Sequence, residues 1–271
     1  MELIFRTESI SPRVTRIFAF NSELMYLVEG DERAALLDTG SGFGSLRACV
    51  DTLTDKPIVV LLTHGHTDHA LGAAEFDEVH MNPLDEMVYA RHSDLGYRKR
   101  SGAMWPDFGK LREYQIVPAL PFSAMQPLRE GDAFDLGGET VECFACPGHT
   151  PGSLVFLLRE ERMLLLGDAC NDQTFLFDDF TLPVAEYRRS LLRLEALTAG
   201  KYGRVLLSHG DGEGVPDMID RVVGVCDDIL DGRSDEQPFT FLEETALLAK
   251  ACGPDGARLD GGRGNIVYKA E

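Results

Sequence analysis

The sequence of 271 residues predicts an α/β fold for this chain. Short apolar runs, several of them rich in β-branched residues, alternate with segments in which apolar residues recur at helical spacing. Apolar residues make up 44% of the composition, which is enough for the core of one large domain or two small ones. Polar residues that could carry chemistry follow directly after several apolar runs, and α/β sheets collect their active sites at such strand ends.

The first apolar region predicts an antiparallel meander, because turn signals interrupt it at Asn21-Ser22 and at Gly30-Asp31. The last strand of the meander ends at Asp38, where a Gly-rich turn leads into a helix that we expect at 45–53. The three strands are expected at 14–20, 24–29 and 34–38.

A buried strand is expected at 58–62, where Pro57 precedes a run with three β-branched residues. The loop after it holds three of the seven histidines of the chain. Imidazole and carboxylate groups are ligands that zinc accepts, and the i, i+2 spacing of His64 and His66 lets both rings face one side. Asp68 and His69 follow where the chain can turn over and offer further ligands. This loop therefore predicts a metal site.

Shorter elements are expected next: a helix near 70–75, a strand at 78–81 and a helix at about 83–92. His80 and His92 have no evident partners in the sequence, so we interpret them as structural or solvated. The region 93–127 follows no clear period, and it holds Trp105, several other aromatic residues and the basic run Arg98-Lys99-Arg100. We expect a lid or a wall of the substrate pocket there, with an ordinary helical excursion as the alternative.

A second β-rich half begins near residue 131, with hairpins expected at 133–136 with 140–145 and at 154–158 with 163–166. Prolines and glycines then fix a loop around His149, the last strand of the second hairpin leads to Asp168, and a short strand at 205–207 leads to His209. Cys143 and Cys146 form a CxxC, but the flanking alternation is typical of a strand. Buried, reduced thiols are therefore favoured over a redox or zinc role.

The remaining segments have mainly helical spacing. Helices are expected at 187–199, 215–231 and 241–252, and a last strand at 265–269. We therefore expect a single domain over 1–271, with a lid-like insertion at about 93–127 and a helical C-terminal extension at about 215–271. The extension either packs on the domain or forms a contact in a homo-oligomer.

Charge and hydropathy restrict the partners of the protein. The formal net charge of -19 repels phosphate backbones, so a small-molecule substrate is expected rather than a nucleic acid. No apolar run reaches the roughly 18 residues that a membrane span needs, and the N-terminus lacks the pattern of a secretory signal. We expect a cytoplasmic protein without membrane contact.

The polar segments resemble, in order, the motifs of the metallo-β-lactamase-fold hydrolase superfamily. HxHxDH occupies 64–69, GHTPGS contains His149, GDA contains Asp168 and SHG contains His209, while LLDTG precedes the first helix. This resemblance implies a four-layer αββα sandwich of two mixed sheets flanked by helices. It also implies a dinuclear metal site at one edge.

The resemblance further implies which residues bind two divalent ions. His64, His66 and His149 would bind the first ion, Asp68, His69 and His209 the second, and Asp168 both. Asp38 would hold a ligand histidine through a hydrogen bond. Zinc is the default metal for this set, with iron or manganese as alternatives. Asp68 is also the candidate catalytic residue, which would either orient the nucleophile or pass a proton to the leaving group.

The implied activity is hydrolysis of a small ester, lactone or thioester by a hydroxide that bridges the two ions. Asp168 argues against a true β-lactamase, and the absence of a tyrosine shortly after it argues against a homoserine-lactone lactonase. The acidic tail does not suit a glyoxalase-II-like thioesterase, nor does the acidic surface suit an RNA-processing enzyme. His66 and the chain length argue against a flavodiiron oxygen reductase.

Two other hypotheses remain open at this stage. The first is a phosphodiesterase of a small phosphorylated metabolite, for which the basic run at 98–100 would suit a phosphate. The second is a redox di-iron protein or a non-catalytic metal-binding protein. Because Cys170 lies close to Asp168 in the sequence, a thiol or persulfide substrate also stays open.

Overall fold

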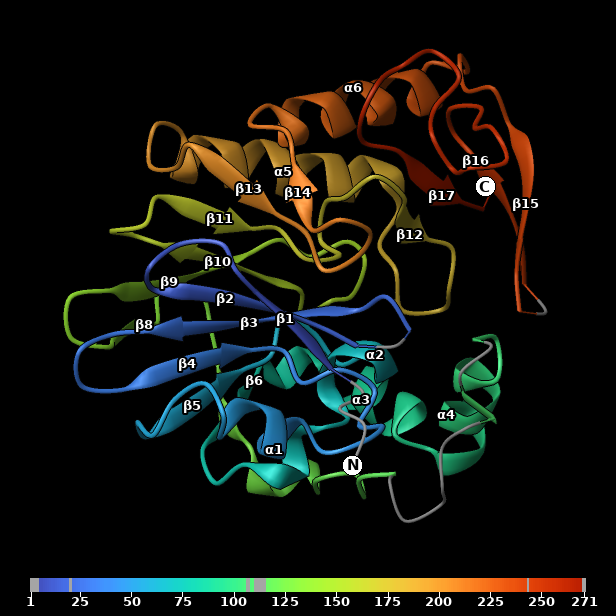
Figure 1. Ribbon diagram of the computed structural model, residues 1–271. Coiled ribbons are helices and arrows are strands. Elements are labelled where there is room, and N and C mark those ends of the chain that lie inside the picture. Colours follow the sequence, from blue (N-terminus) through green and yellow to red (C-terminus); the bar gives the residue numbers. More distant parts are fainter. Residues whose placement is uncertain (1–4, 20, 106–107, 110–115, 243, 270–271) are drawn as a thin grey trace.

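The computed structural model gives the structure of residues 5–19, 21–105, 108–109, 116–242 and 244–269. Two β-sheets pack face to face, and helices cover the outer face of each (Figure 1). This four-layer sandwich confirms the predicted fold class. Parts of the predicted elements lie outside the described residues: Phe20 in the first strand, 106–107 and 110–115 in the lid-like insertion, and 243 and 270–271 in the C-terminal extension.

The first sheet has seven strands in the order β1-β2-β3-β4-β5-β6-β7. Strands β2 to β4 form the antiparallel meander that the turn signals predicted, β1 extends it by a strand that was not predicted, and β5, β6 and β7 then add in parallel. The strands are β1 (Arg6–Ser9), β2 (Val14–Phe18), β3 (Leu24–Glu29), β4 (Ala34–Leu37), β5 (Ile58–Leu61), β6 (Val79–Met81) and β7 (Gln126–Pro127).

The second sheet has six strands in the order β14-β13-β11-β10-β9-β8. Only the pair β11 and β13 is parallel, so this sheet is also mixed. The strands are β8 (Ala133–Asp135), β9 (Thr140–Ala145), β10 (Leu154–Leu158), β11 (Met163–Leu165), β13 (Arg204–Leu206) and β14 (Glu213–Gly214).

Three apolar layers hold the sandwich together. The layer between the sheets contains Tyr26, Leu61 and Phe156, while separate layers fill the space between each sheet and its helices. The first sheet is covered by helices α1 (Leu46–Val50), α2 (Thr67–Ala70) and α3 (Glu86–His92). The same side holds the short 3-10 helices η1 (Ala73–Glu75), η2 (Pro83–Asp85) and η5 (Phe122–Ala124). The second sheet is covered by α5 (Val184–Thr198) and α6 (Met218–Leu230). In the part of the chain described here, none of the helices combines the length and the apolar character that crossing a membrane requires.

A third, four-stranded sheet corrects the prediction of a helical C-terminal extension. Its order is β12-β17-β16-β15, so the end of the chain pairs with a strand from the middle of it. The described residues of 241–252 do not form the predicted helix, although Glu, Ala, Leu and Lys favour helices. Pairing with a neighbouring strand outweighs this weak local preference. The strands are β12 (Thr174–Leu176), β15 (Gln237–Phe241), β16 (Glu244–Leu248) and β17 (Ile266–Tyr268).

Helix α4 (Leu95–Gly102) lies in the insertion at 93–127 and is anchored by Arg98. The Arg98 side chain is buried, and its guanidinium donates hydrogen bonds to the backbone carbonyls of Val117 (2.8 Å), Ser41 (2.9 Å) and Gly42 (3.4 Å). Arg98 therefore ties this helix to the body of the domain. Because the Arg98 side chain is buried and bonded within the fold, it is not placed to bind a substrate phosphate, contrary to the suggestion from the sequence.

The CxxC residues lie on opposite sides of β9, as a strand requires. Cys143 points into the layer between the sheets, and Cys146, just past the strand, packs in the layer under α5 and α6. Both thiols are free and buried. Their positions agree with the interpretation of these cysteines as core residues.

Glu139 is a carboxylic acid without exposed surface at the start of β9. It accepts hydrogen bonds from the backbone N–H groups of Glu160 (3.2 Å) and Glu161 (3.0 Å). Burial raises the pKa of Glu139 to about 7, and the two N–H groups offset only part of this effect. The folded state thus favours the neutral acid. The resulting stabilisation is complete below the ordinary pKa of 4.5 and is lost as the pH rises through about 7.

Replacing Glu139 with glutamine should remove this pH dependence. Between the two pKa values the wild-type protein loses up to about 1.4 kcal/mol per pH unit, whereas the amide has no proton to release. Urea titrations at pH 5, 6, 7 and 8 measure the unfolding free energy of both proteins. The value of the variant minus that of the wild type should increase as the pH rises. The control is Glu86→Gln at an exposed position, and a constant difference for Glu139→Gln would contradict the assignment.

Candidate metal centre

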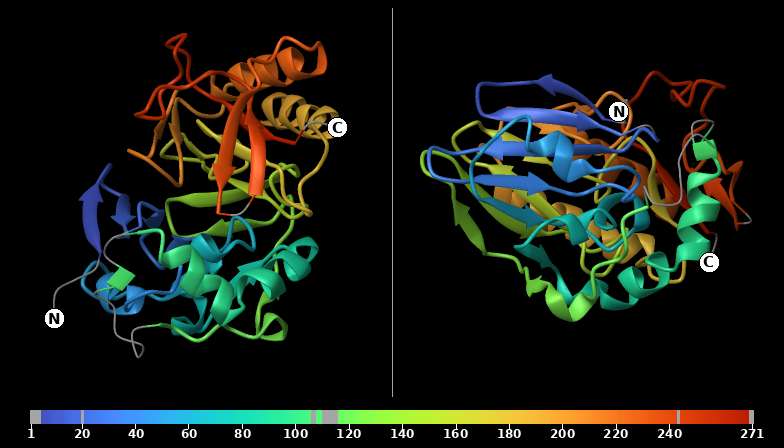
Figure 2. Two further views of the ribbon diagram at one scale, coloured as in Figure 1. Left: turned by 90° about the vertical axis from the view of Figure 1, so that its right-hand side faces the viewer. Right: turned by 60° about the horizontal axis from the view of Figure 1, so that its bottom comes forward.

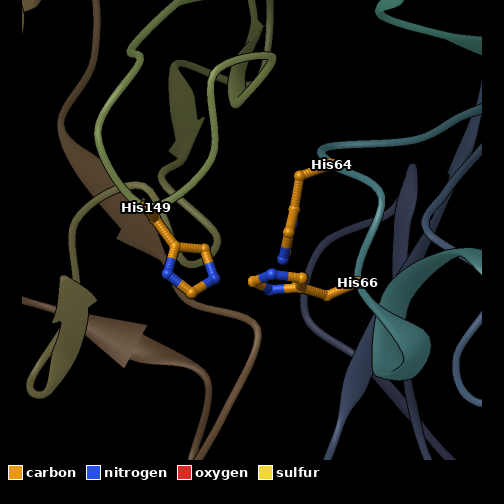
Figure 3. A group of neighbouring side chains, drawn as sticks. All are labelled: His64, His66 and His149. Carbon is orange, nitrogen blue, oxygen red and sulfur yellow. The ribbon is translucent and has the colours of Figure 1, made fainter. Parts of the chain in front are cut away.

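Seven side chains gather into two adjoining groups at the ends of strands from both sheets. Within each group, the atoms that could bind a metal lie within 4.8 Å of one another. The first group is His64, His66 and His149, and the second is Asp68, His69, Asp168 and His209. Figure 3 shows the rings of the first group converging, two from one loop and the third from a loop opposite. The structure thus brings together all seven residues that the sequence singled out.

Asp168 lies between the two groups. Its Oδ2 atom is 3.1 Å from His209 Nε2 and 3.4 Å from His69 Nε2, both in the second group, and 3.8 Å from His149 Nε2 in the first. The Oδ2 atom of Asp68 approaches only the second group, at 3.6 Å from His69 Nε2 and 3.5 Å from His209 Nε2. One carboxylate therefore adjoins both groups, and the other adjoins only the second.

Each group combines residues from both sheets. The loop after β5 carries His64 and His66 and leads into α2, which carries Asp68 and His69. The loops after β9, β11 and β13 in the second sheet carry His149, Asp168 and His209, respectively. As predicted, these polar residues follow apolar strands, and the ends of those strands bring them together.

Hydrogen bonds fix the orientation of three of the rings. The Nδ1 atom of His149 lies 2.8 Å from the carbonyl oxygen of Phe175, that of His69 lies 2.8 Å from Asp38 Oδ2, and that of His64 lies 2.9 Å from Thr63 Oγ1. The carbonyl and the carboxylate can only accept, so these Nδ1 atoms of His149 and His69 carry the proton. The Nε2 atoms of His64, His69 and His149 are buried and have no hydrogen-bond partner. Buried lone pairs of this kind fit a divalent cation.

Asp38 positions one ligand histidine and the loop that carries the others. It follows β4 with a left-handed backbone (φ 62°) and is almost completely buried. Besides His69, it accepts hydrogen bonds from the backbone N–H (2.7 Å) and the hydroxyl (2.8 Å) of Thr63. The contact with His69 is the one that the resemblance implied, and the contacts with Thr63 add a tie to the start of the histidine loop.

Asp85 joins the two loops that carry the first group. Its carboxylate accepts hydrogen bonds from Gly65 N (2.8 Å) in one loop and from Gly152 N (2.6 Å) and the Thr150 hydroxyl (2.8 Å) in the other. Glycine is needed at position 65, because a Cβ atom there would lie 2.9 Å from the backbone nitrogen of Tyr89. This close approach is what brings the histidine loop within reach of Asp85.

The electrostatic environment differs between the two groups. Burial and the neighbouring histidines lower the pKa of His64, and burial lowers the pKa of His149 to about 4. Burial alone would also lower the pKa of His209, but Asp168 and Asp68 outweigh it and raise the pKa to about 9. Burial would raise the pKa of Asp168, yet His209 and His69 hold it well below its usual range. The carboxylates of Asp68 and Asp168 therefore stabilise positive charge at the second group, and a divalent cation can supply that charge in place of protons.

A third group, His66, His92 and Asp178, was missed by the sequence interpretation. The ring of His92 stacks on that of His66 at 4.3 Å between centroids, and Asp178 Oδ2 lies 3.6 Å from His66 Nε2. His92 is buried and accepts a hydrogen bond from Thr67 N (3.3 Å), so the expectation that it has no partner is wrong. No motif surrounds Asp178, and only its place in the fold reveals it.

Cys170 faces away from these groups. Its thiol is buried in the layer under α5 and α6, where its sulfur lies 3.9 Å from the carbonyl oxygen of Met218. Burial raises its pKa well above the usual value. A buried, protonated thiol is inert, so the structure gives Cys170 no part in a thiol or persulfide reaction.

The sequence of this chain is similar to the sequences of several proteins whose names differ. It is 31% identical to the lactamase-like protein vrtG of Penicillium aethiopicum over 199 residues, which cover 69% of this chain and 54% of that protein. It is 28% identical to the acyl-coenzyme A thioesterase MBLAC2 of Gallus gallus over 208 residues, which cover 70% of this chain and 73% of the relative. The chain thus spans about half the length of the fungal relative.

Solved structures show the same fold. A metallo-beta-lactamase from Pontibacter korlensis matches with a TM-score of 0.61 at 17% identity, over 82% of this chain and 99% of the other. The metallo-beta-lactamase FIM-1 from Pseudomonas aeruginosa, in a mono-zinc form, matches with a TM-score of 0.59 at 16% identity, over 84% and 96%. The family model of the metallo-beta-lactamase superfamily matches residues 20–209, which include both groups. The chain therefore belongs to the metallo-β-lactamase superfamily.

Proposed function

We propose that this protein is a zinc-dependent hydrolase that cleaves a small carboxylic thioester or ester. The position of Asp168 carries the proposal, because its Oδ2 atom adjoins ring nitrogens of both groups. The first group would hold one ion, the second group would hold another, and Asp168 would contact both. Buried imidazole lone pairs with two carboxylates are a donor set that suits zinc.

Each part of the site would have its own role in hydrolysis. Bound ions would supply a water of lowered pKa and would stabilise the negative charge that develops on the carbonyl oxygen. We assign to Asp68 the handling of the proton of the attacking water at Oδ2, because its side chain is 32% exposed whereas that of Asp168 is 12% exposed. Asp38 would keep the ring of His69 in place during the reaction through the bond to Nδ1.

The relatives favour a thioester among the carboxylic substrates. Two of the proteins to which the chain is similar are named an acyl-coenzyme A thioesterase and an atrochrysone carboxyl ACP thioesterase. The phosphodiesterase hypothesis has lost one supporting residue, because Arg98 is used within the fold. Cytoplasmic localisation and a small-molecule substrate remain part of the proposal.

Elemental analysis of protein purified without added metal tests the proposal. We expect about two zinc ions per chain, as two-metal hydrolases hold, and hydrolysis of S-acyl-N-acetylcysteamine thioesters that a chelator abolishes and zinc restores. Bis(p-nitrophenyl) phosphate serves as the comparison substrate for the phosphodiesterase hypothesis. Iron with visible absorbance would favour the redox hypothesis instead. Protein that neither contains nor takes up metal would overturn the proposal.

A further inference from the structure

Four phenylalanine rings gather on the third sheet beside the metal centre. We call them the aromatic face: Phe175, Phe177, Phe239 and Phe241. Phe175 lies 5.6 Å from Phe239 and 5.2 Å from Phe241 between ring centroids, although β12 and β15 are the two outer strands of the sheet. Neighbouring strands are about 4.8 Å apart, so a flat sheet would keep outer strands roughly 14 Å apart. The sheet must therefore curve, with the rings on its concave side.

The aromatic face is only partly covered by the protein itself. Phe177 is buried, and so are Val267 and Leu248 in the same cluster, whereas Phe175, Phe239 and Phe241 each keep part of their surface exposed. Exposed aromatic surface gathered in one place marks a site of binding more often than isolated apolar residues do. Phe239 pairs across the ladder with the small residue Ala246, which leaves the space above it open to the ring.

The segment 175–178 connects this face to the metal centre. The carbonyl oxygen of Phe175 accepts the hydrogen bond from His149 Nδ1, while the ring of the same residue lies in the aromatic face. At the other end of the segment, Asp178 approaches His66 at 3.6 Å. Figure 3 shows ribbons of the C-terminal part of the chain passing on the His149 side of the group. The aromatic face thus adjoins the first group at the contact between Phe175 and His149.

The hairpin of β15 and β16 lies outside the part of the chain that the family model matches. The family match ends at residue 209, so Phe239 and Phe241 lie beyond it. Figures 1 and 2 show the hairpin extending from the third sheet towards the side of the molecule that carries α4. A curved wall in this position would limit and define the space next to His149.

We propose that the aromatic face binds the apolar acyl or aryl group of the substrate, while the carbonyl to be cleaved sits at the metal centre. This inference rests on the proposed function and adds the substrate class, an acyl group of medium length rather than acetyl. Apolar groups are recognised by the apolar area that they bury, so each added methylene should increase the specificity of the reaction until the face is filled.

The test compares acetyl and octanoyl thioesters of N-acetylcysteamine with the zinc-loaded protein. We expect kcat/KM of the wild type to be at least about tenfold higher for octanoyl, and we expect Phe239→Ala/Phe241→Ala to lose about tenfold on octanoyl with little change on acetyl. The control is Phe134→Ala, which removes a partly buried ring from β8 at the far edge of the second sheet. Equal losses on both substrates in the double variant would overturn the inference.

Calorimetric binding of octanoate, with acetate for comparison, separates this inference from the proposed function. If the wild type hydrolyses no thioester but the double variant binds octanoate about tenfold more weakly, the aromatic face stands and the proposed activity fails. Unchanged octanoate binding in the double variant overturns the aromatic face. Phe241→Trp, which fills the concave side without opening the cluster, replaces the double variant if that variant does not fold. It should weaken octanoate binding and leave acetate unchanged, and any other result counts against the inference.

Discussion

An Asp168→Ala variant is expected to bind fewer zinc ions than the wild type and to lose more than about a hundredfold in kcat/KM. Its Oδ2 atom lies within 3.8 Å of ring nitrogens from both groups, so the substitution removes a ligand from two ions at once. Elemental analysis and zinc titration measure the first effect, and thioester hydrolysis measures the second. Asp168→Asn, which keeps one neutral oxygen, should lose less metal than alanine does.

The matched control for this variant is Asp179→Ala. The Asp179 carboxylate is 79% exposed and pairs with Arg91 at 3.0 Å on the surface, where ion pairs contribute little. Metal content and rate should be unchanged in the control, and thermal unfolding should show that both variants are folded. Wild-type metal content together with a wild-type rate in Asp168→Ala would be incompatible with a shared carboxylate.

An Asp85→Ala variant is expected to lower the unfolding free energy by about 3 kcal/mol or more. The substitution leaves two backbone donors, Gly65 N and Gly152 N, without an acceptor, whereas the Thr150 hydroxyl keeps Ser153 Oγ as a partner at 2.8 Å. Each buried unsatisfied donor costs about 1–3 kcal/mol, with partial relief where water can enter. Urea unfolding measures this loss.

The same variant should also weaken zinc binding, although Asp85 belongs to neither group. Asp85 holds the loop of His64 and His66 against the loop of His149, so its loss lets the three rings separate. Asp85→Asn keeps an acceptor oxygen and should show smaller losses of both stability and zinc affinity. An alanine variant as stable as the wild type would show that the two loops hold together without this carboxylate.

The metal centre was predictable because its residues obey a local rule. Asp38, His64, His149, Asp168 and His209 each follow an apolar run within a few residues, and apolar runs of this kind form strands. Strands that share a sheet bring their ends together, and the packing of the two sheets then brings the ends of both sheets to one place. The division of these residues into two groups was predicted from the resemblance of the ordered motifs to the metallo-β-lactamase superfamily.

The parts that the sequence did not predict depend on contacts between distant segments. Residues 244–248 read locally as a helix, and pairing with β15 and β17 makes them a strand. Asp85, His92 and Asp178 have no motif of their own, and each has its role through a partner from another loop. No local pattern encodes such partners, since they arise only after the sheets have packed.

The apolar layer between the two sheets also sets the spacing of the candidate metal ligands. Each group takes residues from loops on opposite sheets, so the thickness of the layer that contains Tyr26 and Phe156 fixes how far apart those loops stand. Metal–ligand distances tolerate errors of only about 0.2 Å. A substitution deep in this layer is therefore expected to shift the candidate ligands relative to one another without touching any of them. Residues far from the histidines thus belong to what determines the geometry of the site.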